Sequence, residues 1–435
     1  MNSIIVAFHT LGCKLNFAET STLIRKFREL GYQITDFDKE ADIYIIHSCS
    51  VTSVAEKKSR AAIYQAHRRN PKAFIAVIGC YSELEAKKLK AISGVQWVLG
   101  NQEKFRITEL ISRDFSTNLE VSVTSLDSEP SKNLQEFHPA YSSGDRTRSF
   151  LKIQDGCDHF CSYCSIPYAR GKSRSPSVQE ALQWAQKAAA DGVKEIVLTG
   201  VNIGDFGRKN GESLYDLLQL FDKGRIVKRV RLSSIEPELL SDDIIRLIAE
   251  SRVLMPHFHI PLQSGSDTIL KRMKRKYTTK VFESRVKYIK QLMPYACIAC
   301  DIIVGFHGET DELFEETRQF IQSLPLSYMH VFTYSERSNT PAASLDGKVS
   351  PQIKHQRSQM LHQYSAAKLD QFYKLCQHQW VNVLFESENT DGMMSGYSEN
   401  YIRIETPFRE DFVNQIIHLP LEQRNVTGNY AYYPR

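Results

Sequence analysis

The segment DGCDHFCSYCSIPYARG, residues 155–171, places Cys157, Cys161 and Cys164 on one short loop with the spacing C-x3-C-x2-C. Three thiolates at this spacing can hold three irons of a cubane iron–sulfur cluster and leave the fourth iron open for a small molecule. A zinc site with a distant fourth ligand is the alternative, but zinc loops usually come as two C-x2-C pairs, and no second pair follows at a suitable distance. The loop therefore indicates an iron–sulfur cluster with one open iron.

Alternating strands and helices surround this loop. Six apolar segments are expected as strands, with helical segments between them: SFLKIQDGC, EIVLTGVN, RVRLSSIEP, HFHIPLQSG, IACDIIVGF and YMHVFTYS. Strands joined through helices run parallel, and six such units are too few to close an eightfold barrel. We therefore predict an α/β fold for this part, a partial (β/α)6 barrel with its chemistry at the carboxyl ends of the strands.

Three strands of a separate parallel α/β domain each end in a cysteine. The segments SIIVAFHTLGC, ADIYIIHSC and AFIAVIGC end at Cys13, Cys49 and Cys80. The carboxyl ends of parallel strands lie at one edge of a sheet, which is the edge that binds ligands in α/β proteins. We therefore expect these three thiols to gather there. The remaining thiols are expected in hydrophobic cores: Cys297, Cys300 and Cys376.

These patterns divide the chain into five parts. Residues 1–113 form the N-terminal α/β domain, 114–148 a linker rich in serine and acids, and 149–350 the partial barrel. A long polar helix over 351–376 then connects to residues 377–435, whose short β segments and Gly and Asn turns predict a small β-barrel.

Composition agrees with a globular protein of several domains, since 42% of the 435 residues are hydrophobic and 24% are charged. The first residues do not resemble a secretory signal, and no stretch reaches the ~20 apolar residues of a membrane span. We expect a cytoplasmic protein with no membrane partner, in which nine cysteines are metal ligands or buried thiols rather than disulfides. The net charge of +5 permits an anionic partner without requiring one.

The cysteine loop and the partial barrel together resemble the radical S-adenosylmethionine (radical SAM) superfamily. The resemblance implies that the amino and carboxylate groups of S-adenosylmethionine bind the open iron of the cluster. The motifs LGCKLN, IHSCSVT and VIGCYSE further resemble the three-cysteine domain of methylthiotransferases, and the C-terminal β segment resembles the RNA-binding TRAM domain. Such enzymes carry two 4Fe-4S clusters, so Cys13, Cys49 and Cys80 would hold the second one, also with one iron open.

Within this family, LGCKLN, RLSSIEP and HIPLQSGSDTILKRMKRKYT look most like one branch, which adds a methylthio group to C2 of N6-threonylcarbamoyladenosine beside the anticodon of tRNA. The isopentenyladenosine branch more often has glutamine where Lys14 stands. Two loop positions depart from the family pattern, since His307 stands at a usual proline and Asn339 at a usual glycine.

Several other functions remain open at this point. The chain could belong to the isopentenyladenosine branch or the ribosomal-protein branch of the same family. It could also be a radical enzyme whose second cluster only relays electrons, or a noncatalytic RNA-binding protein with a structural metal.

Five further residues at or near strand ends are candidates for binding the cofactor: Tyr163, Asn202, Ser234, Glu236 and Gln263. By resemblance, Tyr163 lies near the adenine, Asn202 faces the methionine end, and Glu236 binds the ribose or the methionine amine. Each position also has a structural alternative, namely packing, a tight turn, a surface carboxylate or a capped strand end. His257 and His259 share one strand face and are expected to pack, because the sequence run offers no third metal ligand.

Basic residues concentrate in KRMKRKYTTK, where six of ten side chains are basic. A charge run is usually a solvated face, but a second basic stretch at Lys57–Arg69 and the resemblance to RNA enzymes favour contact with tRNA. The predicted RNA-binding residues are Lys271, Arg272, Lys274, Arg275, Lys276 and Arg403. The resemblance also implies a sulfur donor and an electron donor such as a flavodoxin or ferredoxin, and we expect a monomer.

Overall fold

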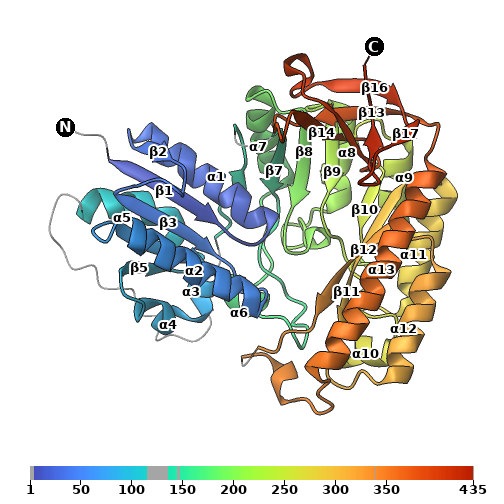
Figure 1. Ribbon diagram of the computed structural model, residues 1–435, viewed down its shortest axis with the longest axis horizontal. Helices are drawn as coiled ribbons and strands as arrows, with labels where there is room; N and C mark the ends of the chain where they lie inside the picture. Colours follow the sequence, from blue (N-terminus) through green and yellow to red (C-terminus); the bar gives the residue numbers. More distant parts are fainter. Residues whose placement is uncertain (1–3, 115–135, 145–146, 338, 435) are drawn as a thin grey trace.

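The computed structural model describes residues 4–114, 136–144, 147–337 and 339–434. An N-terminal α/β unit, a central barrel and a C-terminal β unit follow one another along the chain (Figure 1). Most of the predicted linker at 114–148 lies outside the described residues. Inside it, Ala140–Tyr141 forms strand β6.

The N-terminal unit is a five-stranded parallel sheet in the order β2-β1-β3-β4-β5. Its central strand β3 has the sequence IYIIHS and is buried along its whole length, which explains its continuous apolar character. The strands are β1 (Ile5–Thr10), β2 (Gln33–Thr35), β3 (Ile43–Ser48), β4 (Phe74–Gly79) and β5 (Val95–Leu99). The helices are α1 (Lys14–Glu29), α2 (Ser53–Arg69), α3 (Cys80–Leu84), α4 (Ala86–Lys90), η1 (Glu103–Arg106) and α5 (Ile107–Asp114).

The central unit confirms the predicted partial barrel. Its six parallel strands, β7 to β12, fall into two sheets, ordered β6-β7-β8-β9 and β10-β11-β12, and β6 pairs antiparallel with β7. The bridge between Val230 and Leu254 links β9 to the chain just before β10. The strands are β7 (Arg148–Lys152), β8 (Glu195–Thr199), β9 (Arg229–Leu232), β10 (His257–His259), β11 (Cys297–Val304) and β12 (Tyr328–Thr333). The α-helices are α6 (Ile166–Arg170), α7 (Val178–Ala190), α8 (Leu214–Gly224), α9 (Asp242–Glu250), α10 (Asp267–Arg272), α11 (Thr279–Leu292) and α12 (Asp311–Ser323). The short helical turns are η2 (Ile203–Asp205) and η3 (Pro341–Ser344).

The chain then runs along the barrel as helix α13 (Pro351–Leu375) and ends in a mostly antiparallel β unit. The strand order is β16-β13-β14-β15-β18-β17, and β15 and β18 form its parallel pair. Among the described residues no pairing joins β16 to β17, so the sheet is open where the sequence predicts a small barrel. The elements are β13 (Trp380–Phe385), β14 (Met393–Tyr397), β15 (Arg403–Pro407), η4 (Glu410–Phe412), β16 (Ile416–Pro420), β17 (Gln423–Arg424) and β18 (Tyr430–Ala431).

Polar and apolar contacts fix the C-terminal unit to the barrel. Arg231 of β9 donates to the backbone oxygen of Glu399 at 2.9 Å, and Arg148 of β7 pairs with Glu386 at 3.0 Å. Cys297 of β11 and Cys376 after α13 belong to the same buried cluster as the C-terminal strands, and Cys300 packs in the barrel core. All three thiols are therefore core thiols, as predicted.

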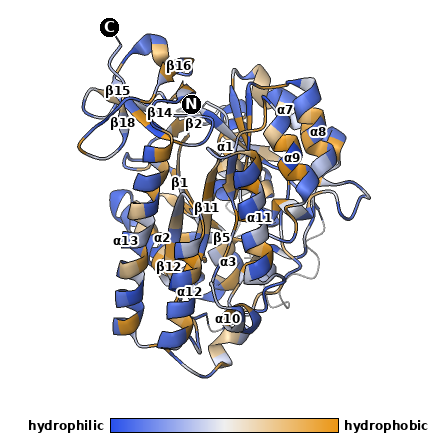
Figure 2. Ribbon diagram, turned by 90° about the vertical axis from the view of Figure 1, so that its right-hand side faces the viewer, coloured by the Kyte–Doolittle hydropathy of each residue, from blue (hydrophilic) through white to orange (hydrophobic). Residues whose placement is uncertain are grey.

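Hydropathy follows the layers. The strands are largely hydrophobic and α13 is largely hydrophilic along its length (Figure 2). None of the helices in the described ranges has both the length and the apolar character needed to cross a membrane.

Candidate active site between the N-terminal sheet and the barrel

The structure brings Cys13, Cys49 and Cys80 to neighbouring strand ends of the N-terminal sheet. They follow β1, β3 and β4, which lie side by side in the sheet. Gly12 has a φ of +104°, and a β-carbon there would lie 2.9 Å from the sulfur of Cys49, so only glycine allows this close approach. Because the thiols lie close to one another, each of Cys13 and Cys49 has its pKa raised in part by Cys80.

The surroundings of this trio suit a cluster that carries negative charge on its thiolates. Burial raises the pKa of the Cys49 thiol to about 12, so the free thiol stays protonated. Iron supplies the positive charge that a buried thiolate needs. Burial raises the pKa of the Cys13 thiol, and the charge of the buried Arg170 guanidinium offsets part of that rise. Three converging thiols beside a buried cation therefore fit the second 4Fe-4S cluster that the resemblance implies, which we call the auxiliary cluster.

The C-x3-C-x2-C loop forms a closed turn at the carboxyl end of β7. The backbone N–H of Cys157 donates to the carbonyl of Gly171 at 3.0 Å and closes the loop on itself. Gly156 has a φ of +71°, and a β-carbon there would lie 2.1 Å from the carbonyl oxygen of Lys172. Burial raises the pKa of Cys164 to about 12. The loop thus presents three protonated thiols that fit a cluster in the same way as the first trio.

Arg275 belongs to this loop site and not to an RNA-binding surface, so that prediction was wrong. Its side chain is only 5% exposed, forms an ion pair with Glu236, and donates to the sulfur of Cys161 at 3.1 Å. The segment turns at Lys274, which has a φ of +56°, so the next side chain points inward. Each cysteine trio therefore has one buried arginine beside it, Arg170 or Arg275.

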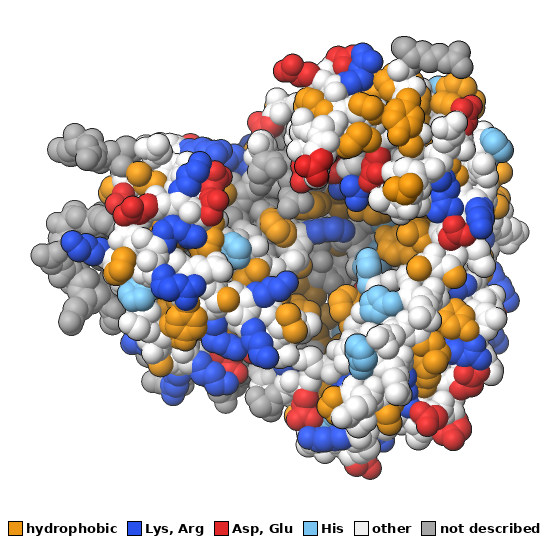
Figure 3. All heavy atoms as spheres, viewed as in Figure 1, with side chains coloured by type: hydrophobic (Ala, Val, Ile, Leu, Met, Phe, Trp, Pro, Cys, Tyr) orange, Lys and Arg blue, Asp and Glu red, His pale blue; other side chains and the backbone are white. Residues whose placement is uncertain are grey.

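A cavity of about 260 Å³ lies between the cysteine loop and the segment that follows Cys49. One wall carries Cys164 and Tyr163 of the loop, another carries Val51 and Thr52, which follow Cys49, and a third comes from β11 and β12. We call this cavity the interdomain chamber. Its described lining residues are Val51, Thr52, Tyr163, Cys164, Ser165, Ile166, Gln263, Asp301, Ile303, Phe332, Thr333, Tyr334, Ser335 and Arg337. Figure 3 shows that the surface of the molecule is hollowed between the N-terminal unit and the barrel.

The structure brings two of the five predicted cofactor-binding residues, Tyr163 and Gln263, into this chamber. The other three do not line it. Glu236 is held by Arg275, and Ser234 lies 2.8 Å from the ring of His259. The amide oxygen of Asn202 is buried and has no hydrogen-bond partner in the described part of the chain, so it is free to accept from a ligand.

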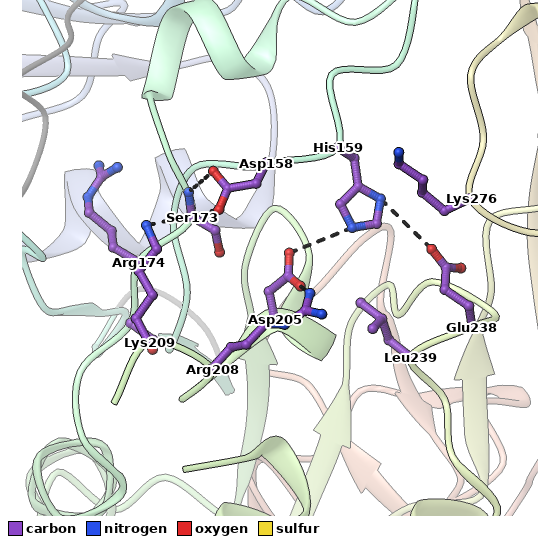
Figure 4. Close-up of a pocket in the computed structure, with 11 residues that line it drawn as sticks. Asp158, His159, Ser173, Arg174, Asp205, Arg208, Lys209, Glu238, Leu239 and Lys276 are labelled. Carbon is purple, nitrogen blue, oxygen red and sulfur yellow. Dashed lines mark hydrogen bonds and ion pairs between the residues drawn. The ribbon is translucent and has the colours of Figure 1, made fainter. Parts of the chain in front are cut away.

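A second pocket, of about 310 Å³, lies against the same cysteine loop (Figure 4). His159 points into it between two carboxylates, 3.8 Å from Asp205 and 3.9 Å from Glu238. Burial raises the pKa of Glu238. Lys276 also lines this pocket, so this predicted RNA-binding lysine borders the cysteine loop (Figure 4).

Sequence reasoning missed a buried charge network that joins the N-terminal sheet to the barrel. The carboxylate of Glu19 on α1 lies 2.6 Å from the ammonium of Lys104 and 2.7 Å from that of Lys152 on β7. Arg170 reaches the same carboxylate at 3.2 Å and donates to Asn16 at 2.7 Å. The network crosses from one structural unit to the other and fixes the spacing of the two cysteine trios.

The interpretation of His259 as a packing residue was wrong. Its Nε2 lies 2.9 Å from an oxygen of Asp301, and Nδ1 of His330 lies 3.1 Å from the same oxygen. The ligand-type atoms of the three residues all lie within 4.8 Å of one another. The sequence run around His259 shows no partner because the partners come from the next two strands of the sheet. His257 does pack, against the ring of Tyr401 at 4.5 Å.

Only some of the predicted RNA-binding residues are exposed in the structure, and further basic residues are exposed on another face. Lys271, Lys274 and Lys276 are exposed, whereas Arg272 is engaged by Asp346 at 2.6 Å. Arg403 is 45% exposed and lies 3.4 Å from Glu405. Basic side chains also gather over the face that carries α2 and α4 (Figure 3). Their exposed members include Lys57, Lys58, Lys87, Lys88 and Lys90.

The C-terminal unit presents an aromatic pair that the sequence analysis did not single out. Trp380 is 63% exposed and stacks on His418, with ring centroids 5.0 Å apart. Tyr430 is buried, and Tyr401 packs against Tyr397 and the guanidinium of Arg148. The one signal for Trp380 in the segment WVNVLF is that an aromatic residue occupies an outward-facing position of the strand.

Glu83, beside the first cysteine trio, is expected to make the stability of the protein depend on pH. Burial raises the pKa of this carboxyl to about 7, against an ordinary value of about 4.3 in the unfolded chain. The folded protein holds this proton more tightly, so its contribution to stability is present below about pH 4.3 and is lost as the pH rises through 7. Melting temperatures of Glu83→Gln and the unaltered protein should therefore diverge between pH 5 and 7, whereas the exposed control Glu40→Gln should show no such divergence.

Comparisons with known proteins define the class of enzyme first. The family model described as the radical SAM superfamily matches residues 151–321, and the model described as uncharacterized protein family UPF0004 matches residues 5–100. The fold also matches the radical S-adenosylmethionine methyltransferase TsrM from Kitasatospora setae, with a TM-score of 0.58, 13% identity, and coverage of 78% of this chain and 77% of that one.

Curated relatives narrow the class. The threonylcarbamoyladenosine tRNA methylthiotransferase MtaB of Bacillus subtilis is 36% identical over 99% of this chain and 96% of its own length. A tRNA-2-methylthio-N(6)-dimethylallyladenosine synthase of Bacillus velezensis is 32% identical over 95% of this chain and 82% of its own length. The chain therefore belongs to the radical SAM methylthiotransferase family, and the resemblance found in its motifs is confirmed.

Proposed function

We propose that this enzyme adds a methylthio group to C2 of N6-threonylcarbamoyladenosine next to the anticodon of tRNA. One observation carries the proposal: the cysteine loop of the barrel and the segment that directly follows Cys49 of the N-terminal trio border a single interdomain chamber. A reaction that moves a sulfur-containing group onto an unactivated carbon needs a radical site and a sulfur site within reach of the same substrate. The MtaB relative of Bacillus subtilis, matched along nearly the whole chain, supports the threonylcarbamoyl branch.

The proposed cofactors are two 4Fe-4S clusters and S-adenosylmethionine. Cys157, Cys161 and Cys164 would hold the first cluster, and the N-terminal trio the second one. When bound, these groups supply the electron transfer, the radical and the sulfur chemistry. The chain itself binds the cofactors, orients the substrate and shields both from solvent. Tyr163 contributes an aromatic wall packed at 6.1 Å from Phe306, suited to a nucleobase, and Arg275 places a positive charge beside the first trio.

Of the other four predicted cofactor contacts, Gln263 and Asn202 are proposed to keep a direct role, and Glu236 and Ser234 an indirect one. Gln263 has a φ of +63° and lines the chamber, so its side chain is set toward a ligand by a backbone turn. Asn202 offers its unpaired amide oxygen to the methionine end of S-adenosylmethionine. Glu236 acts through its ion pair with Arg275, and Ser234 acts through the ring of His259.

The second candidate function is methylthiolation of isopentenyladenosine in tRNA. It is favoured by the Bacillus velezensis relative, a dimethylallyladenosine synthase that is 32% identical over 95% of the chain. Mass spectrometry of tRNA nucleosides from a strain lacking the protein separates the two candidates. Loss of the methylthio derivative of threonylcarbamoyladenosine supports the first, and loss of that of isopentenyladenosine supports the second.

The partners follow from the same proposal. The substrate is tRNA, and the enzyme acts on it as a monomer in the cytoplasm. A flavodoxin or ferredoxin donates the electrons, and a separate donor supplies the sulfur. A base in a tRNA loop is readily unstacked and can enter a chamber that a paired base cannot reach. Exposed lysines on the Lys271–Lys276 segment and the stacked Trp380–His418 pair are proposed to hold the RNA outside it.

Replacing Lys271 and Lys274 together by glutamine is expected to weaken tRNA binding most at low salt. Each lost phosphate contact should flatten the slope of log affinity against log salt by about 0.7–0.9. Titration of labelled tRNA with the full-length protein at several salt concentrations measures this slope. Arg275 is left in place because it belongs to the cysteine site.

The control is the pair Lys187→Gln and Lys223→Gln on the exposed faces of α7 and α8. Net charge falls by the same amount in both doubles. An equal loss of slope in the control would show that net charge, and not this segment, governs binding.

A further inference from the structure

A polar wall runs across three neighbouring strands of the barrel. His259 of β10, Asp301 of β11 and His330 of β12 share one oxygen of the Asp301 carboxylate, at 2.9 Å and 3.1 Å. Ser234, after β9, extends the wall at 2.8 Å from Nδ1 of His259. Asp301 also lines the interdomain chamber, so the wall stands at the edge of the proposed substrate site.

The hydrogen bonds fix which ring atoms carry protons. The carboxylate can only accept, so Nε2 of His259 and Nδ1 of His330 both donate to it. Nδ1 of His259 then accepts from the hydroxyl of Ser234. The three side chains satisfy one another and need no metal ion. The ring atom left over is Nε2 of His330, whose side chain is 47% exposed.

A lysine from the N-terminal unit lies close to this wall. Lys14 is the first residue of α1, directly after Cys13, and it is exposed. Asp301 and His257 are both within electrostatic range of its ammonium group. Among the described residues, no hydrogen bond or ion pair engages that ammonium. The two other cations in range are already paired, Arg148 with Glu386 and Arg231 with Glu195.

We propose that Lys14 binds the carboxylate of the N6-threonylcarbamoyl substituent, that Nε2 of His330 accepts a hydrogen bond from its hydroxyl, and that these two contacts select this substrate. The inference rests on the proposed function and names the residues that read the substituent. Asp301 is a positioning residue, because it orients the ring of His330 without itself touching the substrate.

Charge and polarity of the wall fit this substituent and not an isopentenyl group. The threonylcarbamoyl group ends in a carboxylate and a hydroxyl, whereas the isopentenyl group is a hydrocarbon. An unpaired ammonium gains a charge-assisted hydrogen bond from the first and is only desolvated by the second. A site built around such polar groups rejects an analogue that leaves them unpaired.

The test compares an acid with its ester. Reconstituted full-length enzyme is given anticodon stem-loop RNA carrying either threonylcarbamoyladenosine or its methyl ester, which keeps the shape and removes the charge. The unaltered enzyme should prefer the acid in kcat/KM and in RNA binding by about 10- to 100-fold, the size expected for a charge-assisted contact. Lys14→Gln should lose most of this preference. His330→Gln and Asp301→Asn should keep it and should weaken binding of the acid and the ester alike, because both carry the hydroxyl.

The control is Lys26→Gln, an exposed lysine in the last turn of the same helix. It should keep the full preference for the acid. Because Lys14 adjoins Cys13, iron per chain is measured in every variant, and RNA binding is measured as well as turnover. RNA binding needs no turnover, so the acid preference in binding keeps the test decisive if Lys14→Gln loses iron.

Two results are distinguishable. If the unaltered enzyme modifies threonylcarbamoyladenosine but the acid preference is absent, or is unchanged in Lys14→Gln, the receptor is wrong and the proposed function stands. If the unaltered enzyme gives no methylthio product from this RNA, the proposed function fails and the receptor with it.

Discussion

Combined replacement of Cys13, Cys49 and Cys80 by alanine is expected to abolish methylthio transfer while S-adenosylmethionine cleavage stays measurable. The three thiols lie at the edge of the N-terminal sheet, whereas the C-x3-C-x2-C loop closes on itself through its own backbone. Removing one trio therefore leaves the other complete. Iron per chain should fall from about eight to about four, because each cubane cluster holds four irons.

The matched experiment replaces Cys157, Cys161 and Cys164 by alanine. This variant should lose both S-adenosylmethionine cleavage and methylthio transfer while it keeps about four irons. Cys376→Ala, which removes a buried thiol outside both trios, is the control and should keep about eight. Methylthiolated tRNA from the first triple variant would contradict the assignment of an auxiliary cluster to the N-terminal sheet.

Replacing Glu19 by glutamine should have the largest effect on stability. The change keeps the shape of the side chain but removes the charge that pairs with Lys104 on one side and with Lys152 and Arg170 on the other. Asp155 still pairs with Lys152 and Arg170, so Lys104 is the cation of this group that loses its ion-pair partner among the described residues. Breaking a buried ion pair by removing one partner typically costs about 3–5 kcal/mol, because the remaining charge stays buried and uncompensated. The midpoint of urea unfolding of the anaerobically purified protein should fall accordingly.

Glu29→Gln, at the exposed end of the same helix, is the control for this change. It removes the same charge where no buried partner depends on it and should shift the midpoint little. Equal midpoints for Glu19→Gln and Glu29→Gln would mean that the network does not hold the two units together.

The sequence could predict what depends on local pattern. Each of β1, β3 and β4 is a short apolar run followed by a cysteine, and parallel strands put those ends at one edge. The barrel strands could be predicted equally well, because apolar runs alternate with amphipathic helices. The loop cysteines needed only their spacing.

What could not be predicted depends on contacts between distant segments. Arg275 and Lys276 look alike in a basic run, yet one turns inward to the cysteine loop and the other stays exposed. Glu19 is one acid on an ordinary helix until Lys104 and Lys152 meet it from two other elements. The partners of His259 lie about forty and seventy residues away, so no sequence window contains them.

The C-terminal unit shows the same division. Alternation of apolar residues predicts its strands, but the sequence cannot say which aromatic side chains face outward. Tyr430 is buried in the core of the unit, whereas Trp380 on β13 stands exposed beside His418 on β16. Which face a strand turns to solvent is set by what packs against the other face.

The most direct test of the whole account is mass spectrometry of nucleosides after full-length, reconstituted enzyme acts on tRNA that carries threonylcarbamoyladenosine. The account predicts a new nucleoside with a methylthio group at C2 of this adenosine, formed only when S-adenosylmethionine and a reductant are present. A methylthio group found on isopentenyladenosine instead, or cleavage of S-adenosylmethionine with no sulfur added to tRNA, would contradict it.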